Sequence, residues 1–247
     1  MFRGMFRSGS FWADYFDSIF IPDIDAYASC LIKRLLPSFE NLDNEANRIE
    51  QKEYERLCSS WGHDEYVDSA SLAERAMNKA IAYMQTISGI QQGLINLFGA
   101  GLYHLFEQQL LFYHRRELLI PTEENRLAFL KGSKTHELLA ANGIDITFFT
   151  SWARLDELRL LANAVKHADG QSCAQLRVQR PDLFCSPISV ETGFPFVRSV
   201  VYQPLAGEGI YLNEVEFKRY VEDVKAFWSE LGQRLIERDK HNGLRSV

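Results

Sequence analysis

The stretch LINLFGAGLYHLFEQQLLFYHRRELL, residues 94–119, decides the fold class. At helical spacing its apolar side chains cover nearly the whole circumference, and a helix that is apolar on almost every side is typical of the middle of a bundle. The small residues 99–101 let a neighbouring backbone approach closely, and Pro121 ends the helix. The most apolar part, 93–106, is about 14 residues long, whereas a membrane span needs about 20. We therefore expect a buried helix of a soluble protein that has no membrane partner.

The hydrophobic pattern on both sides of this segment also has the helical period of about 3.6 residues. Ser71 and Glu74 form a predicted capping box, Ser151 is a predicted N-cap, and Gly143 and Gly170 are predicted helix ends. The pattern predicts an all-α fold. The predicted helices cover residues 24–36, 40–58, 71–93, 94–119, 122–131, 135–141, 152–167, 172–180 and 214–239.

No repeat or long linker separates two cores, so we expect a single α-helical domain. Aromatic side chains near the start fall at helical spacing, which favours a helix packed on the core over a partner-binding or membrane-surface arm. Prolines and β-favouring runs after residue 183 predict an irregular or β-hairpin insertion. The predicted parts are an N-terminal helical extension (1–67), a bundle core that carries the motif helix (70–180), the surface insertion (183–212) and a long C-terminal helix (213–240).

The composition excludes several classes of protein. With 46% hydrophobic, 24% charged and 13% aromatic residues, the chain is close to the average folded protein, which excludes a disordered chain, a collagen-like fibre and a coiled-coil rod. The formal charge of −6 argues against generic wrapping of nucleic acid but allows a small basic site. The four cysteines have no CxxC or zinc-ligand spacing, so we expect free thiols, a cytoplasmic protein and no metal.

The segment DELRLLANAVKHADG, residues 156–170, carries the functional groups. At 100° per residue, Asp156, Arg159, Asn163, Lys166 and His167 fall within an arc of about 100°. Apolar residues border this polar stripe on both sides, which is typical of a groove or of a surface that a second subunit half covers. A guanidinium can bind phosphate, and an imidazole can transfer a proton near neutral pH. The alternative is a solvated helix face whose ion pairs only stabilise the fold.

The same segment resembles the last conserved helix of the HEPN superfamily, compact α-helical proteins that are widespread in bacterial toxin and antiphage systems. The signature of that superfamily is an arginine, often followed by a polar residue, and then a histidine a few positions later. Asn163 and His167 match this spacing, whereas Ala162 occupies the position of the arginine and Arg159 lies one turn earlier. HLFEQQLLFYHRREL (104–118) and FWSEL (227–231) also resemble the superfamily, and the architectural resemblance covers about residues 70–240.

The resemblance implies an all-α, HEPN-like helical bundle that forms a homodimer and cleaves RNA as a metal-independent endoribonuclease without cofactors. His167 would deprotonate a ribose 2′-hydroxyl that attacks the adjacent phosphorus. Arg159, with Lys166, would stabilise the phosphate charge, and Asn163 would orient the phosphate or the imidazole. In a toxin or antiphage setting a regulatory or antitoxin protein would bind the effector. The alternative is a catalytically inactive HEPN-fold subunit that binds a nucleotide or acts through a protein partner.

Two further groups of polar residues lie on the buried helix. His104 and Glu107 resemble half of a metal site, but no second Glu-x-x-His completes it, so a self-satisfied buried pair is favoured. Glu107 or Gln108, with Asp156 on the motif helix, would instead support the position of Arg159.

Basic residues at the end of the same helix have two interpretations. His114, Arg115 and Arg116 are favoured there by the helix dipole, and the two arginines could also line a phosphate-binding groove. Arg154 has no feature that separates it from an ordinary surface arginine. P-loop, dinucleotide-binding and nucleophile-elbow motifs are absent from the sequence, which disfavours those chemistries.

Overall fold

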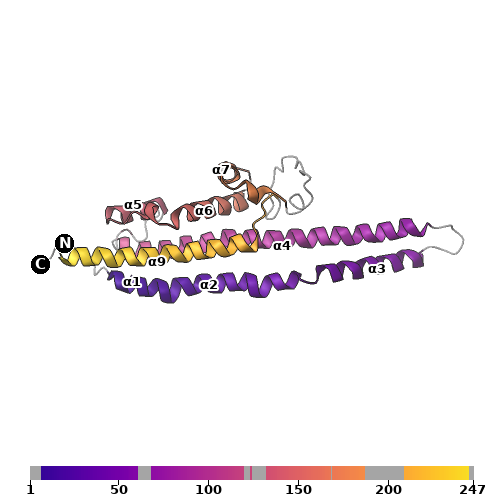
Figure 1. The fold of residues 1–247 in the computed structure, drawn as a ribbon, viewed down its shortest axis with the longest axis horizontal. Coiled ribbons are helices and arrows are strands. Elements are labelled where there is room, and N and C mark those ends of the chain that lie inside the picture. Colours follow the sequence, from indigo (N-terminus) through magenta and orange to yellow (C-terminus); the bar gives the residue numbers. More distant parts are fainter. Residues whose placement is uncertain are drawn as a thin grey trace.

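The computed structural model describes residues 7–60, 68–119, 123, 132–167, 169–186 and 209–244. These residues form an elongated all-α bundle with no β-strand among them, so the predicted fold class is confirmed (Figure 1). The α-helices are α1 (Gly9–Tyr15), α2 (Ile21–Cys30), α3 (Leu42–Ser60), α4 (Ser69–Tyr113), α5 (Gly132–Ala141), α6 (Trp152–His167), α7 (Gln171–Gln179) and α9 (Glu214–Leu244). The short helical turns between them are η1 (Phe16–Phe20), η2 (Leu31–Leu35), η3 (Leu36–Phe39), η4 (His114–Leu118), η6 (Ile146–Phe148) and η7 (Pro181–Phe184).

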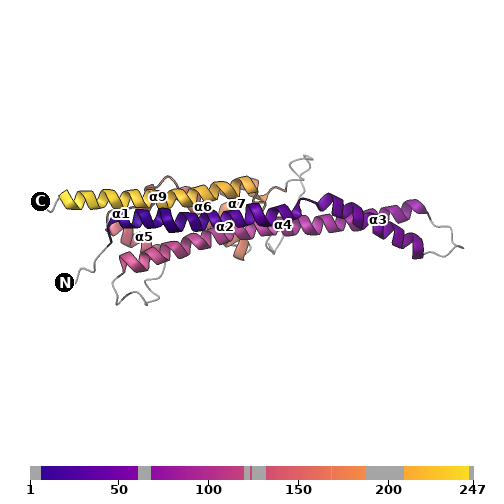
Figure 2. The same ribbon diagram turned by 90° about the horizontal axis from the view of Figure 1, so that it is seen from below.

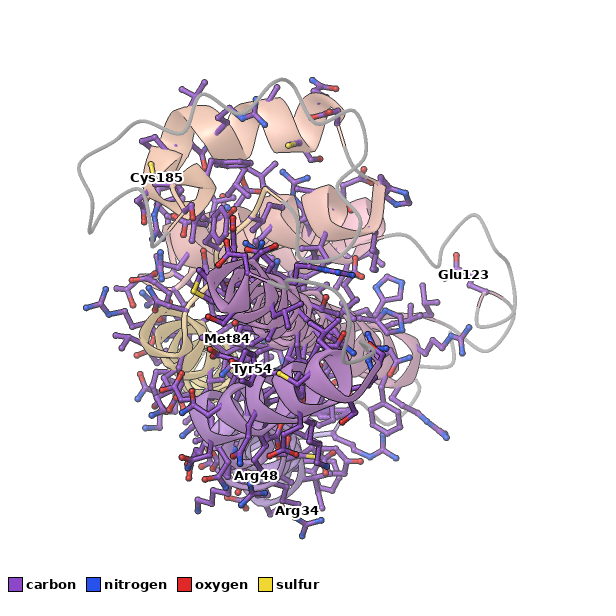
Figure 3. All side chains as sticks on the ribbon, turned by 90° about the vertical axis from the view of Figure 1, so that its right-hand side faces the viewer. Arg34, Arg48, Tyr54, Met84, Glu123 and Cys185 are labelled. Carbon is purple, nitrogen blue, oxygen red and sulfur yellow. The ribbon has the colours of Figure 1, made fainter. Side chains whose placement is uncertain are left out.

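Helix α4 is the spine of the molecule. Its 45 residues give it a length of about 68 Å. The N-terminal part pairs with α3 in a two-helix arm, and the C-terminal part lies inside the body between α6 and the N-terminal helices (Figures 1 and 2). Figure 3 shows this arm end-on, with Tyr54 and Met84 on its helices and Cys185 in the layer of α5, α6 and α7.

The two helices predicted at 71–93 and 94–119 are therefore one, and the prediction of a break was wrong. Gly89 lies in the helix with nothing within 4 Å of the position of a Cβ atom, so it interrupts no packing. The helix also begins earlier than predicted, because the Asp68 carboxylate accepts a hydrogen bond from Ala70 N at 3.0 Å. The predicted capping box at Ser71 and Glu74 thus falls inside the first turns.

The first helices of the chain pack into the core. Trp12 and Phe16 are at most 1% exposed and pack against Tyr113 of α4, while Phe16 and Phe20 also contact Trp228 of α9. The predicted packing of an aromatic N-terminal helix is confirmed. The aromatic side chains thus join the first and last helices of the chain to the spine.

The segment before α9 is attached to the spine by buried amides. Asn96, which is fully buried, donates to Ile210 O at 2.8 Å and accepts from Leu212 N at 3.3 Å. Gln92 donates to Leu212 O at 2.8 Å. These bonds satisfy an irregular backbone that has no helical partner. Most of the predicted insertion, residues 187–208, lies outside the described residues, as does the predicted helix 122–131 except Glu123.

Most other helix boundaries agree with the sequence prediction within a few residues. Helix α5 ends where predicted, because Gly143 has a φ of 80° and Ile144 N donates back to Leu139 O at 2.9 Å. Ser151 precedes α6, but its hydroxyl is buried without a hydrogen-bond partner, so it is not the predicted side-chain cap. Glu230 of α9 instead accepts from Thr150 N at 2.8 Å. In the described part of the chain, no helix has the length and hydropathy needed to cross a bilayer.

Candidate functional site

Helix α6 places the predicted polar stripe on its accessible face. It lies along α4 on the side opposite α1 and α2 (Figure 1). Of the apolar residues predicted to border the stripe, Leu155, Leu158, Leu160, Ala162 and Val165 are buried, whereas Ala153 is exposed. Asn163 is half-buried, and Lys166 and His167 are exposed at the end of the helix.

Arg159 is held by its own helix. Its Nε donates to Asp156 Oδ1 at 2.8 Å, and both side chains are more than a third exposed. Since Asp156 precedes Arg159 by three residues, this pair directs the guanidinium away from His167. The eight steps from Arg159 to His167 span about 12 Å along the helix axis. Within a single copy of the chain, Arg159 is therefore paired with Asp156. The stripe does not bring Arg159 and His167 together in that copy.

Ala162 occupies the position at which the resemblance places an arginine. It is fully buried against the core. An arginine at this position would have to bury its guanidinium, which is costly without a partner. The packing of α6 therefore explains why this position is small, and it leaves Arg159 as the arginine of the stripe that reaches solvent.

Polar residues of α4 lie beside the same stripe. Tyr103 is largely buried; burial, together with Glu107, raises the pKa of its hydroxyl, while Arg159 lowers it. Tyr103 of α4 is thus within electrostatic range of both Arg159 and Asp156. His104 and Glu107 are about half exposed, with Nδ1 and Oε2 3.9 Å apart, so the prediction of a buried pair was wrong. No contact between Glu107 or Gln108 and α6 is present among the bonds of the described residues, so their predicted support of Arg159 stays a prediction.

The basic residues at the end of α4 separate in the structure. His114 is buried, whereas Arg115 and Arg116 are exposed. The Arg116 guanidinium lies over the Phe112 ring, 5.7 Å from its centroid. Arg115 follows Leu111 by one helical turn and so lies on the α4 face that carries His104. Of the two predicted phosphate ligands, Arg115 is on the side of the candidate site.

Sequence reasoning missed a charge cluster that joins α6, η7 and α9. Arg154 binds Glu157 at 2.5 Å and Glu216 at 3.0 Å, and Arg180 binds the same two carboxylates at 2.6 and 3.0 Å. The Arg154 guanidinium also lies 4.4 Å from the centroid of the Tyr220 ring. Although burial acts to raise it, the pKa of Glu216 is lowered by these arginines. Arg154 is therefore a structural residue, and only its spatial neighbours distinguish it from a surface arginine.

A buried carboxylate at the end of α4 was also missed. Glu117 is 3% exposed and accepts a hydrogen bond from Trp12 Nε1 at 2.8 Å. Burial raises the pKa of Glu117, against the opposing effect of the Trp12 hydrogen bond. A glutamate after two arginines gives no sign of burial in the sequence, because its partner is 105 residues away.

The described residues contain no group of three or more His, Cys, Asp or Glu side chains placed to hold a metal ion. All four cysteines are free thiols, and Cys173 is the buried one. Comparisons with protein-family models, with curated proteins and with solved structures find no match to this chain.

Proposed function

We propose that this chain is a HEPN-like, RNA-cleaving effector that acts as a homodimer. The observation that carries the proposal is the stripe of α6 on which Arg159, Asn163, Lys166 and His167 stay partly or fully accessible, while Leu155, Leu158, Leu160 and Val165 beside it are buried. A helix face that offers a guanidinium, an amide, an ammonium and an imidazole is suited to a phosphodiester that displaces Asp156 from the same face. The roles assigned to these residues are those that the superfamily resemblance implies.

If two copies of the chain pair through α6 about a two-fold axis, Arg159 of one copy can lie close to His167 of the other. Each lies four residues from Asn163, or about 6 Å along the axis, in opposite directions. An antiparallel pairing centred on Asn163 would therefore place Arg159 of one copy beside His167 of the other. Each of the two resulting sites would contain one guanidinium and one imidazole. RNA phosphate would replace Asp156 as the partner of Arg159.

In the proposed reaction His167 accepts the proton of a ribose 2′-hydroxyl. The 2′-oxygen forms a bond to the adjacent phosphorus, and the bond from phosphorus to the 5′-oxygen breaks. The 5′-oxygen takes up a proton, and the other product carries a 2′,3′-cyclic phosphate. Arg159 stabilises the charge that develops on the phosphate oxygens, an effect that is worth several kcal/mol at such sites.

The test is cleavage of end-labelled RNA by the purified chain in the presence of EDTA. We expect products with cyclic phosphate ends, and we expect His167→Ala to lower the rate by about 100-fold or more. His241→Ala is the matched control, because His241 is an exposed histidine near the end of another helix, α9. Cleavage that is equal in the His167→Ala variant and the wild type would refute the proposed role of His167.

A second function is favoured by two features of α6. Ala162 is buried where the resemblance places the arginine, and Asp156 already neutralises Arg159. Both features are suited to a catalytically inactive subunit that uses the same surface to bind a protein partner. Wild-type protein that leaves RNA intact under all conditions of the cleavage assay would favour this second function.

A further inference from the structure

A cavity of about 260 Å³ opens between α5 and α4, the helix against which α6 also packs. Its floor is apolar and includes Phe106 and Leu110, which are both buried. Its rim is polar and includes Tyr103, Glu107 and Gln108. Pockets for drug-sized ligands usually measure about 300–1,000 Å³, so this cavity is suited to one flat ring system.

The rim offers a defined set of hydrogen-bonding groups. An ionised glutamate is an acceptor with about four lone-pair sites, and at Glu107 the His104 Nδ1 atom is 3.9 Å from Oε2, too far for a hydrogen bond. Gln108 Nε2 lies 3.0 Å from His104 Nε2, which occupies one of the two amide hydrogens. Two adjacent acceptor positions at Glu107 and one donor at Gln108 therefore remain at the rim, because both residues line the cavity.

Guanine matches this set. Its Watson–Crick edge has two adjacent N–H donors beside a carbonyl acceptor, and adenine, cytosine and uracil each lack the pair of adjacent donors. A carboxylate can accept from both donors while an amide donates to the carbonyl, and single-stranded RNA exposes this edge to proteins. We propose that the cavity binds a guanine base of single-stranded RNA. The inference rests on the proposed RNA-cleaving function and names the base preference of that site.

Cationic groups lie on both sides of the cavity for the adjoining phosphates. On one side α6, which carries Arg159, packs against α4. On the other side Arg115 follows the lining residue Leu111 by one helical turn. From Tyr103 of α4 to Arg115 of η4, which continues α4, the distance along the helix axis is about 18 Å, which spans several nucleotides. A guanine in the cavity would thus have one neighbouring phosphate directed to the proposed cleavage site.

The test compares the binding of labelled oligouridines that contain a single central guanine, inosine or adenine. The oligonucleotides carry 2′-O-methyl groups, which block attack by the 2′-oxygen. We expect fluorescence anisotropy to show that the full chain binds the guanine oligonucleotide about 5- to 150-fold more tightly than the adenine one, as for a good bidentate base contact. Inosine lacks the second donor and should bind with intermediate affinity.

The Glu107→Gln variant should bind the guanine and adenine oligonucleotides within about 2-fold of each other, because an amide offers one acceptor in place of two. Its affinity for the adenine oligonucleotide should match that of the wild type. Glu74→Gln is the control, since Glu74 is an exposed glutamate in the arm part of the same helix. It should retain the full preference for guanine.

The outcomes separate this inference from the proposed function. Equal wild-type binding of the guanine and adenine oligonucleotides would refute the guanine pocket and leave RNA cleavage standing. If no RNA is bound or cleaved, the proposed function fails, and titration of the full chain with GMP and AMP then tests the pocket alone. Selective GMP binding that Glu107→Gln abolishes would support the pocket, whereas absent or unselective binding would overturn it.

Discussion

The crossing of α1 and α9 allows a stability prediction that can be worked from the distances. Gly9 is buried against α9, and a Cβ atom on it would lie 2.6 Å from Ile236 N and closer still to the carbonyl group of Leu235. These are backbone atoms within a helix, so no side-chain rotation relieves the clash. Gly9→Ala therefore requires α1 to move away from α9, which loosens the packing of Trp12 and Phe16.

Overpacking of this kind costs about 1–3 kcal/mol. The displacement also affects two of the largest buried side chains, so we expect the upper part of that range. The free energy of unfolding of Gly9→Ala should be lower by about 2–3 kcal/mol, which corresponds to roughly 4–12 °C in Tm for a chain of this size. Gly89→Ala is the control, and we expect it to raise the free energy of unfolding rather than lower it. Nothing lies within 4 Å of its Cβ position, and alanine in a helix interior is favoured over glycine by about 0.5–1 kcal/mol.

Both variants are measured by urea unfolding, followed by circular dichroism and by tryptophan fluorescence. Trp12 and Trp228 are buried, and they report on the packing of α1 against α9. A Gly9→Ala variant as stable as the wild type would refute the close crossing of these helices. A Gly89→Ala variant that is strongly destabilised would refute the uninterrupted α4.

Three further predictions concern the dimer, a buried carboxylate and a buried amide. Mixing Arg159→Ala and His167→Ala, each inactive alone, should restore about a quarter of the wild-type RNA cleavage if each site uses both copies, and none if each site lies within one copy. Burial raises the pKa of Glu117 above its usual 4.5, so the native state binds a proton more tightly than the unfolded state does. The contribution of Glu117 to the free energy of unfolding is therefore lost as the pH rises from about 4.5 through the raised pKa. Unfolding of Glu117→Gln between pH 4 and 8 should show that this slope is absent, and parallel profiles would contradict the prediction. Asn96→Ala leaves two buried backbone groups of residues 210 and 212 unsatisfied and should lower the free energy of unfolding by about 2–4 kcal/mol in urea, whereas a loss under 1 kcal/mol would contradict the assigned bonds.

Local sequence pattern was sufficient to predict most of the helices, because each buries an apolar stripe of the helical period. It failed at Gly89 and Gly93, where glycine predicts a break and the helix continues. Packing against α3 on one side and the body on the other outweighs the small propensity cost of glycine. Helix length in this chain is thus decided by tertiary contacts, which the local pattern does not contain.

In the candidate site too, features set by residues close in the sequence could be predicted, whereas contacts between residues distant in the sequence could not. The stripe of α6 could be predicted because its residues lie on one helix, where spacing alone fixes the face. Tyr103 could not be predicted as a neighbour of that stripe, because it is more than 50 residues from Arg159 in the sequence. The same holds for Arg154, whose partners on α9 make it structural.

The ion pair of Arg159 with Asp156 depends both on helix spacing, which the sequence contains, and on the folded structure. Spacing on the helix places both residues in the stripe, and the sequence alone leaves open whether the guanidinium is available. In the folded chain it is paired, yet both side chains remain more than a third exposed, and exposed pairs of this kind contribute only about 0–1 kcal/mol. A phosphate that offers Arg159 a bidentate contact can therefore displace Asp156 at little energetic cost. The pair keeps the arginine ordered in the free protein without removing it from the proposed chemistry.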